Sequence, residues 1–279
     1  MMITKKIPIS FVFRRLQSLT GFFLTLFLFE HLMTNSTASL FLDKGHFFIK
    51  AVSAFQAIPY LKFVEITLIG IPLLFHASLG IKYITTGEVN SFKTDGKKAA
   101  LYQYKRNKAY TWQRITSYIV AILLIFHIVQ MRFINSPKKV TLNKSTYFLV
   151  KIKKDAKLDA LAASMGAKIF SKDETKFLDE KFQKMKLKNF QVLAFTKESG
   201  QAFLLEVRDT FKNPFMVGIY SLFVVAASFH ALNGLWTFLM SWGFIISNRS
   251  QSISLRICFW AMIAIISLGF ISIWSSFFY

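Results

Sequence analysis

The sequence predicts an all-α transmembrane bundle of five helices, with a small α/β insertion outside the membrane between helices three and four. Of the 279 residues, 53% are hydrophobic and the mean hydropathy is +0.42, whereas soluble domains are roughly 45–50% apolar. Five apolar stretches have about the 20 residues needed to cross roughly 30 Å of hydrocarbon. The formal net charge of +21 cannot lie in lipid, so we place it in the loops and the insertion.

The first apolar stretch, 13–34, follows basic residues in the manner of a signal peptide. No small-residue cleavage site comes after it, so we interpret it as a membrane span. The other expected spans are 60–82, 112–134, 214–246 and 254–278. Pro72 in the second span predicts a kink, because proline lacks the N–H of a regular helical hydrogen bond.

Lysine and arginine gather beside one set of helix ends, which predicts that this side faces the cytoplasm. These residues are Lys5, Lys6, Arg14, Arg15, Lys82, Lys93, Lys97, Lys98, Lys105, Arg106, Lys108, Arg114, Arg249 and Arg256. The short loop on the other side has only Lys44, Lys50 and Lys62. We therefore expect the N-terminus to be inside, and the C-terminus and the insertion to be outside.

Residues 138–212 form the expected insertion, between membrane segments 1–137 and 213–279. The sequences TYFLVKI and FQVLAF predict strands, and DAKLDALAASMGAKIF predicts an amphipathic helix that begins at Asp155. KESG predicts a hairpin turn that leads into a further strand, QAFLLEV. The charges are mixed in sign, with lysines beside aspartates and glutamates throughout, which favours a solvated surface over a site for an anionic ligand.

Four of the five histidines lie one apiece in the first four spans: His31, His76, His127 and His230. Ionisable groups inside a membrane are costly and usually face a functional site, and imidazole is a common axial ligand of haem iron. At about 1.5 Å per residue, His31 and His127 lie roughly 20–24 Å from the inner edge of the membrane, and His76 and His230 lie roughly 21–24 Å from the outer edge. Two bis-histidine haems, one above the other, require two histidines at each of two depths. His31 and His127 would bind the outer haem, and His76 and His230 the inner one.

Cationic side chains at the inner helix ends are candidates for binding haem propionates. They are Arg14, Arg15, Arg114 and Arg249; each also has the simpler interpretation of an arginine that sets membrane orientation. The single cysteine, Cys258, excludes a disulfide framework and any thiolate-built zinc or iron–sulfur site. The sequence shows no P-loop, dinucleotide fingerprint or Ser-His-Asp arrangement.

Several segments carry a family resemblance that covers all five spans. FRRLQSLTG, FEHLMTN, LLFHASLG, WQRITSYIVAILLIFHIVQ and FHALNGLWTF with SWGFIISNRSQSIS resemble, in order and spacing, the membrane-anchor cytochrome b of succinate:quinone oxidoreductases of the five-helix, two-haem type. The insertion at 138–212 departs from the family pattern, in which a much shorter segment joins the third and fourth helices.

The resemblance implies a cytochrome b of the succinate dehydrogenase type in a bacterial cytoplasmic membrane. Such an anchor binds an iron–sulfur subunit that carries a flavoprotein subunit, and passes electrons through two haem b groups to a quinone. The quinone expected from the resemblance is menaquinone. The chain shows no flavin or succinate site, so it is not a catalyst alone. The basic loop 82–114 would suit the docking of the soluble subunits, and no nucleic-acid partner is expected.

Quinone reduction also requires protons, and three residues near the expected outer haem are candidates to exchange them: Glu30, His46 and Glu65. Glu65 is favoured, and its simpler interpretation is a carboxylate that reaches the outer interface. Some fumarate-reducing relatives have a glutamate two residues before the fourth ligand, where this chain has Ser228. This difference favours succinate oxidation.

Three other classes of protein share some of these features. The first is a di-haem cytochrome b of another membrane dehydrogenase, such as a formate dehydrogenase or a hydrogenase. The second is a haem-free, proton-coupled transporter, and the third is a membrane-tethered protein that displays the insertion. The third class leaves the sorted histidines unexplained, and the second predicts a colourless protein.

Overall fold

The computed structural model describes residues 7–87, 91–92, 96, 101–142, 145–177 and 187–279. Five helical segments are long and apolar enough to cross a membrane: Ile9–Ser36, Leu61–Thr86, Lys105–Ile134, Pro214–Ser241 and Asn248–Phe278. The predicted multi-pass helical class is therefore confirmed. Many large apolar side chains on these segments are exposed, among them Ile122 and Trp260, which lipid rather than water would cover.

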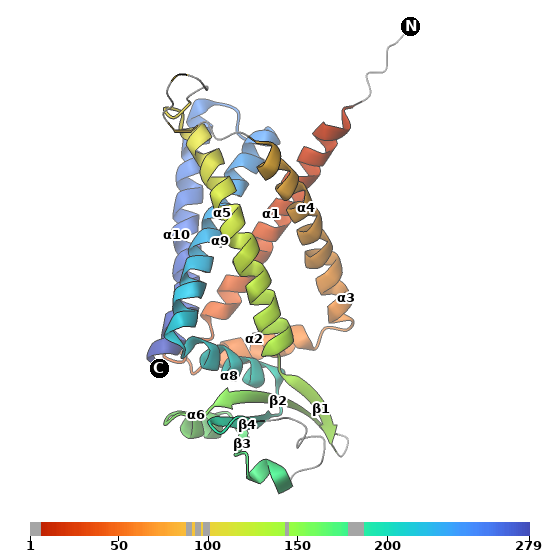
Figure 1. The fold of residues 1–279 in the computed structure, drawn as a ribbon, viewed down its shortest axis with the longest axis vertical. Helices are drawn as coiled ribbons and strands as arrows, with labels where there is room; N and C mark the ends of the chain where they lie inside the picture. Colours follow the sequence, from red (N-terminus) through yellow and green to blue (C-terminus); the bar gives the residue numbers. More distant parts are fainter. Residues whose placement is uncertain (1–6, 88–90, 93–95, 97–100, 143–144, 178–186) are drawn as a thin grey trace. The chain divides into compact units, whose positions relative to one another are not determined.

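The five segments are helices α1 (Ile9–Ser36), α3 to α4 (Leu61–Glu65 and Ile71–Thr86), α5 (Lys105–Ile128), α9 (Pro214–Ser241) and α10 (Asn248–Phe278) (Figure 1). The fourth span is shorter than expected, because α9 ends at Ser241 rather than at 246. Gly243 follows in the left-handed region with φ +79°, a conformation that suits glycine and stops the helix.

Two of the spans contain a π-helical turn. Segment η1 (Ile66–Gly70) joins α3 to α4, and the Ile71 N–H donates to the Ile66 carbonyl instead of the carbonyl four residues back. The wide turn ends two residues before Pro72, which cannot donate a backbone hydrogen bond. Segment η2 (Val129–Ile134) continues α5 in the same way. Both π turns lie near histidines that the sequence singles out.

The structure divides into two compact units. Four of the long helices, α1, α5, α9 and α10, contribute residues to both units. The first unit comprises 1–32, 62–123 and 222–267, and the second comprises 33–61, 124–221 and 268–279. The first unit is helical. The second contains the insertion, the segment between the first two spans, and the remaining ends of α1, α5, α9 and α10.

The insertion is an antiparallel four-stranded sheet with helices, as its α/β class predicted. Strands β1 (Lys138–Leu142), β2 (Ser145–Lys153), β3 (Lys168–Phe170) and β4 (Gln191–Thr196) are ordered β1-β2-β4-β3. Val150 pairs with Ala194 in the centre of the sheet. Leu149 and Leu193 are buried together with Leu187 in a small core, as two adjacent strands with apolar faces require.

Two local predictions for the insertion are wrong. The segment DAKLDALAASMGAKIF forms only a short helix, α6 (Leu158–Ser164), after which Gly166 adopts φ +67° and the chain enters β3. KESG begins a helix instead of a hairpin, and QAFLLEV lies in α8 (Ser199–Phe211). The side chains of Glu198 and Gln201 form a capping box across the first turn. These local hydrogen bonds stabilise the start of a helix.

Helix α8 is the centre of the second unit. Figure 1 shows it between the sheet and a helix that the sequence analysis missed, α2 (His46–Gln56). The two helices pack closely, since a Cβ atom on Gly200 would come within 2.2 Å of the Ile49 carbonyl oxygen. The Gly200 N–H also donates to the Ser53 hydroxyl over 3.1 Å. The segment between the first two spans therefore packs against the insertion.

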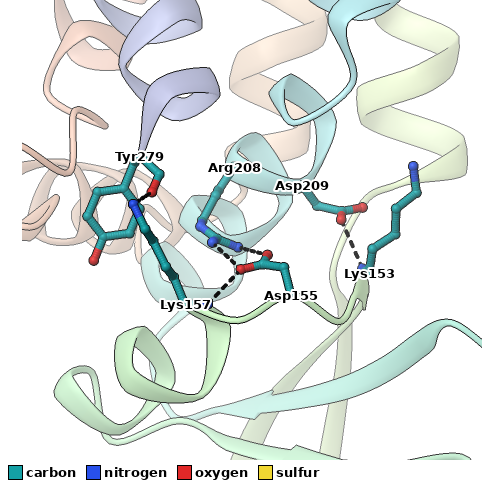
Figure 2. A network of polar contacts seen from close by, with 6 residues as sticks. All are labelled: Lys153, Asp155, Lys157, Arg208, Asp209 and Tyr279. Carbon is teal, nitrogen blue, oxygen red and sulfur yellow. Dashed lines mark hydrogen bonds and ion pairs between the residues drawn. The ribbon is translucent and has the colours of Figure 1, made fainter.

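A polar network fastens α8 to the strand-to-helix loop before α6 and to the end of α10 (Figure 2). Arg208 makes two hydrogen bonds to the Asp155 carboxylate, of 2.7 and 2.8 Å. The Lys157 ammonium donates to the Tyr279 carbonyl, and Asp209 accepts from the Lys153 N–H over 2.9 Å. The Arg208 guanidinium lies 5.8 Å from the Tyr279 ring centre, a cation–π arrangement.

Candidate functional site

The first unit brings two of the four span histidines together. The rings of His76 on α4 and His230 on α9 have their centres 6.3 Å apart and their planes at 88°. At this separation one metal ion fits between the rings, with bonds of about 2 Å to a nitrogen of each. Across the described residues no group of three or more His, Cys, Asp or Glu side chains forms a further metal cluster. The arrangement suits the two axial ligands of one haem.

Hydrogen bonding prepares His76 for this role. Its Nδ1 lies 3.0 Å from the Gln17 carbonyl oxygen on α1, and a carbonyl can only accept, so Nδ1 carries the proton. The lone pair is then on Nε2, the nitrogen that would bind iron. Histidines that bind metal ions commonly donate their other ring N–H to a backbone carbonyl, which fixes the orientation of the ring.

His230 is held through its backbone instead of its ring. The Gln113 side-chain amide donates to the His230 carbonyl over 2.9 Å, and Gln113 accepts from the Asn233 amide over 2.7 Å. Within the described residues, the His230 Nδ1 atom is buried without a hydrogen-bond partner. A buried ring nitrogen without a partner is costly, so the described part of the chain does not itself satisfy the hydrogen-bonding capacity of this ring.

Gly21 allows α1 to approach the His76 ring. A Cβ atom at this position would lie only 2.8 Å from His76 Cε1 and 3.2 Å from Nδ1. One turn earlier on the same helix, Gln17 supplies the carbonyl that orients the ring. Sequence analysis did not single out Gln17, Gly21, Gln113 or Asn233. For Gln17 and Gly21, the signal in the sequence is their spacing of four residues, which places both on one face of the helix.

The four candidate propionate arginines also lie in the first unit, in different environments. Arg15 has its guanidinium 5.5 Å from the Trp242 ring centre, and its Nη1 is buried without a partner in the described chain. Arg114 donates to the carbonyls of Ile84 and Gly87 at the end of α4, over 2.6 and 2.7 Å. Arg14 and Arg249 are exposed. Arg15 therefore fits an anionic group best, while Arg114 also caps a helix.

The second unit holds His127 in a separate polar cluster. His127 Nδ1 lies 3.3 Å from the Tyr220 hydroxyl, and that hydroxyl donates to the Gln130 side-chain oxygen over 3.0 Å. Because the single hydroxyl proton is used for Gln130, Tyr220 accepts from His127 Nδ1, and Nε2 keeps its lone pair. Gln130 belongs to the π turn η2. Sequence analysis missed Tyr220 and Gln130, for which only the spacing of three from His127 to Gln130 gives a signal.

The remaining candidates occupy different places. His31 lies near the end of α1 with its ring centre 5.5 Å from that of Phe27. His31, Glu30 and Glu65 belong to the first unit, whereas His127 and His46 belong to the second, so the pairing of His31 with His127 stays a prediction. His46 is exposed at the start of α2. Of the basic residues used for orientation, Lys5, Lys6, Lys93, Lys97 and Lys98 lie outside the described residues.

One known protein is similar to the chain over nearly its whole length. The succinate dehydrogenase cytochrome b558 subunit of Bacillus subtilis (strain 168) is 26% identical over 261 residues, which is 93% of this chain and 94% of the relative. No family model matches the chain, and no solved structure matches it. The resemblance expected from the sequence is supported by this relative, and its two-haem detail stays a prediction.

Proposed function

Since the chain is a relative of the membrane-anchor cytochrome b of succinate dehydrogenase, we propose that it passes electrons from an iron–sulfur subunit to a quinone in a bacterial cytoplasmic membrane. The iron–sulfur subunit would itself carry the flavoprotein subunit that oxidises succinate. Five apolar helices make the chain a multi-pass membrane protein. We further propose that its N-terminus faces the cytoplasm, and that its C-terminus and the insertion lie outside.

The facing pair of His76 and His230 carries the proposal. The two rings lie 6.3 Å apart, and the Gln17 carbonyl selects the tautomer of His76 that exposes Nε2. We propose that this pair holds an inner haem b and that His31 and His127 hold an outer one. Support for the outer pair comes from the sorting of the four histidines by depth and from the Tyr220 contact that orients His127.

Haem supplies a centre that accepts and gives up one electron at a time, and the chain's own residues hold and surround that centre. His76 and His230 would provide the two axial nitrogens, and Gln17 and Gln113 keep the two histidines in place. Arg15, with its buried and unpartnered Nη1, is the best propionate partner of the four arginines. Gly21 leaves the space against the His76 ring.

Proton exchange at the quinone is assigned to three residues. Reduction of a quinone to a quinol takes two electrons and two protons, and we propose menaquinone as the acceptor. Glu65, at the end of α3, is the favoured proton donor, with Glu30 and His46 as the alternatives. Ser228 is fully buried at 0% exposure, and it offers a hydroxyl where a proton-carrying glutamate would lie in some fumarate-reducing relatives. The proposed direction is therefore succinate oxidation.

Docking of the soluble subunits is proposed for the basic loop and helix start at 82–114. Lys105, Arg106 and Lys108 open α5 and would attract an acidic partner surface. Charge attraction of this kind weakens with salt. Release of the partner subunits from the membrane by added salt would be expected to increase when these cations are replaced by glutamine.

A reduced-minus-oxidised optical spectrum with haem quantitation on the purified complex tests the proposal. We expect about two b-type haems per chain. Single alanine variants at 31, 76, 127 and 230 should each lose or perturb one haem, because each removes one axial nitrogen.

The variant His46→Ala is the matched control, since His46 is exposed in the segment between the first two spans and is not a proposed ligand. It should leave both haems intact. A folded preparation without haem would overturn the proposal and favour the transporter class instead. Haem that survives loss of both His76 and His230 would overturn the assignment of the inner pair.

A further inference from the structure

The insertion buries a carboxyl group that the proposed function does not use. Glu206, in the middle of α8, is 3% exposed. Both of its carboxylate oxygens are buried without a hydrogen-bond partner among the described residues. Glutamate is rarely buried unless it is paired, and leaving such a group unpartnered costs free energy. A feature that costs stability in this way is a candidate for function.

Arg208 and Asp209, the other two ionisable side chains within α8, both have partners, which makes Glu206 an exception. Arg208 binds the Asp155 carboxylate, and Asp209 accepts from the Lys153 N–H (Figure 2). The helix also has close packing on α2 through Gly200. Helix α8 is thus well fixed, and the position of Glu206 follows from that fixed helix.

Helix α8, which carries Glu206, reaches the cluster around His127. The Phe211 ring of α8 has its centre 5.2 Å from that of Tyr220, and Glu206 is within electrostatic range of the Tyr220 hydroxyl when its carboxyl group is ionised. Tyr220 in turn contacts His127 Nδ1 over 3.3 Å and donates to Gln130. A continuous series of side chains therefore runs from the insertion to a proposed haem ligand within the second unit.

Burial makes Glu206 a neutral acid at neutral pH. Burial and, to a smaller extent, the charge of Asp209 raise the pKa of Glu206 to about 9. Helix α2 and strands β2 and β4 pack against α8. Their ionisable groups are Tyr147, Lys151 and Lys153 of β2 and His46 and Lys50 of α2, and β4 has none. The last three of these are exposed, so their charges are screened by water.

We propose that Glu206 is a positioning residue of the outer electron-transfer site, which acts through Tyr220 on His127 and makes the insertion a pH-sensitive regulator of that site. The proposal rests on the proposed function, because it needs a haem at His127. A protonated Glu206 adds no charge near the His127 cluster, whereas an ionised Glu206 adds a negative charge. A negative charge near the cluster stabilises the oxidised, more positive form of a haem bound at His127 and lowers the reduction potential of that haem.

Redox titrations of the purified complex at a series of pH values test the proposal. In the wild-type protein we expect the potential of one haem to fall as the pH rises through about 9. The variant Glu206→Gln keeps the size and neutrality of the protonated side chain, so its potential should stay level over the same range. Asp159→Asn is the matched control, since Asp159 is an exposed carboxylate of α6 in the same insertion, and it should behave as the wild type.

The outcomes separate this proposal from the one on which it rests. Absence of haem from the wild type would refute the proposed function itself. Two haems in the wild type, with the same pH-dependent fall in Glu206→Gln or no fall at all, would refute the role of Glu206 alone. If Glu206→Gln does not assemble, Tyr220→Phe gives a second test, because loss of the hydroxyl should also weaken the pH dependence.

An infrared difference spectrum gives a reading that does not depend on the potentials. The wild-type complex at neutral pH should show the carbonyl stretch of a protonated, buried carboxylic acid that shifts when the haems are reduced. This band should be missing in Glu206→Gln and present in Asp159→Asn. A band that persists in Glu206→Gln would assign the acid to another residue and contradict the proposal.

Discussion

Two residues of helix α1 determine the tautomer and the position of the His76 ring. The Gln17 carbonyl fixes the proton on Nδ1, and the missing side chain of Gly21 leaves room for the ring. Neither contribution is visible in the residue types alone, because glycine and glutamine occur in many membrane helices for packing reasons. The sequence predicts His76 as a haem ligand, and only the structure shows the groups that would orient it.

Replacing Gly21 by alanine should displace the His76 ring. The added Cβ atom would lie 2.8 Å from His76 Cε1, and the ring cannot turn away without losing its bond to Gln17. We expect about one haem per chain in place of two, with the helices still formed. Haem quantitation on the purified variant measures the loss.

Gly218→Ala is the control for this change, because a Cβ atom on Gly218 of α9 meets nothing within 4 Å. Its haem content should equal that of the wild type. Retention of both haems in Gly21→Ala would show that His76 does not need its present position to hold a cofactor.

At the scale of elements, the long spans were predictable and the short helices were not. A run of about 20 apolar residues is typical of a helix that crosses a membrane. Helix α8 was mistaken for a strand, because a short apolar segment such as QAFLLEV fits both periods and because the Glu198–Gln201 capping box was overlooked. Helix α2 was missed because its fold depends on burying Phe48 and Ile49, a tertiary effect outside local sequence.

The ion pair between Asp155 and Arg208 should be essential to the attachment of α8. Arg208 is 2% exposed and Asp155 is 31% exposed, so Asp155→Asn leaves a buried charge without its partner. We expect a loss of about 3 kcal/mol from the stability of the insertion, at the low end of the range for a broken buried pair because Asp155 is partly solvated. Hydrogen exchange over 138–212 in the purified complex measures the loss.

The same pair gives a pH dependence with a defined sign. The hydrogen bonds from Arg208 hold the pKa of the Asp155 carboxyl below its usual value. The stabilisation is therefore complete above the unfolded pKa of about 4 and is lost as the pH falls through the lower folded value. Asp155→Asn should lack this acid-dependent part, whereas Asp159→Asn should retain it. Equal acid sensitivity in all three proteins would contradict the assignment.

On the scale of the whole molecule, the proposed ligands are distributed between two compact units. His76 and His230 both belong to the helical unit, and His127 belongs to the unit that contains the insertion. Composition and spacing predicted four ligands in two pairs. They could not predict that the insertion would pack against α2, because that contact depends on a helix the sequence did not reveal.

Replacing 138–212 by a short Gly/Ser linker should therefore affect the two haems differently. Without α8, the buried side chains of Phe48 and Ile49 on α2 would face water, and Tyr220 would lose its contact with Phe211. We expect the haem at His76 and His230 to remain and the haem at His127 to be lost or shifted in potential. Optical spectra and redox titration of the variant complex measure both. Loss of both haems would mean that the insertion is needed for the whole bundle to fold, and two unchanged haems would mean that the second unit holds His127 without it.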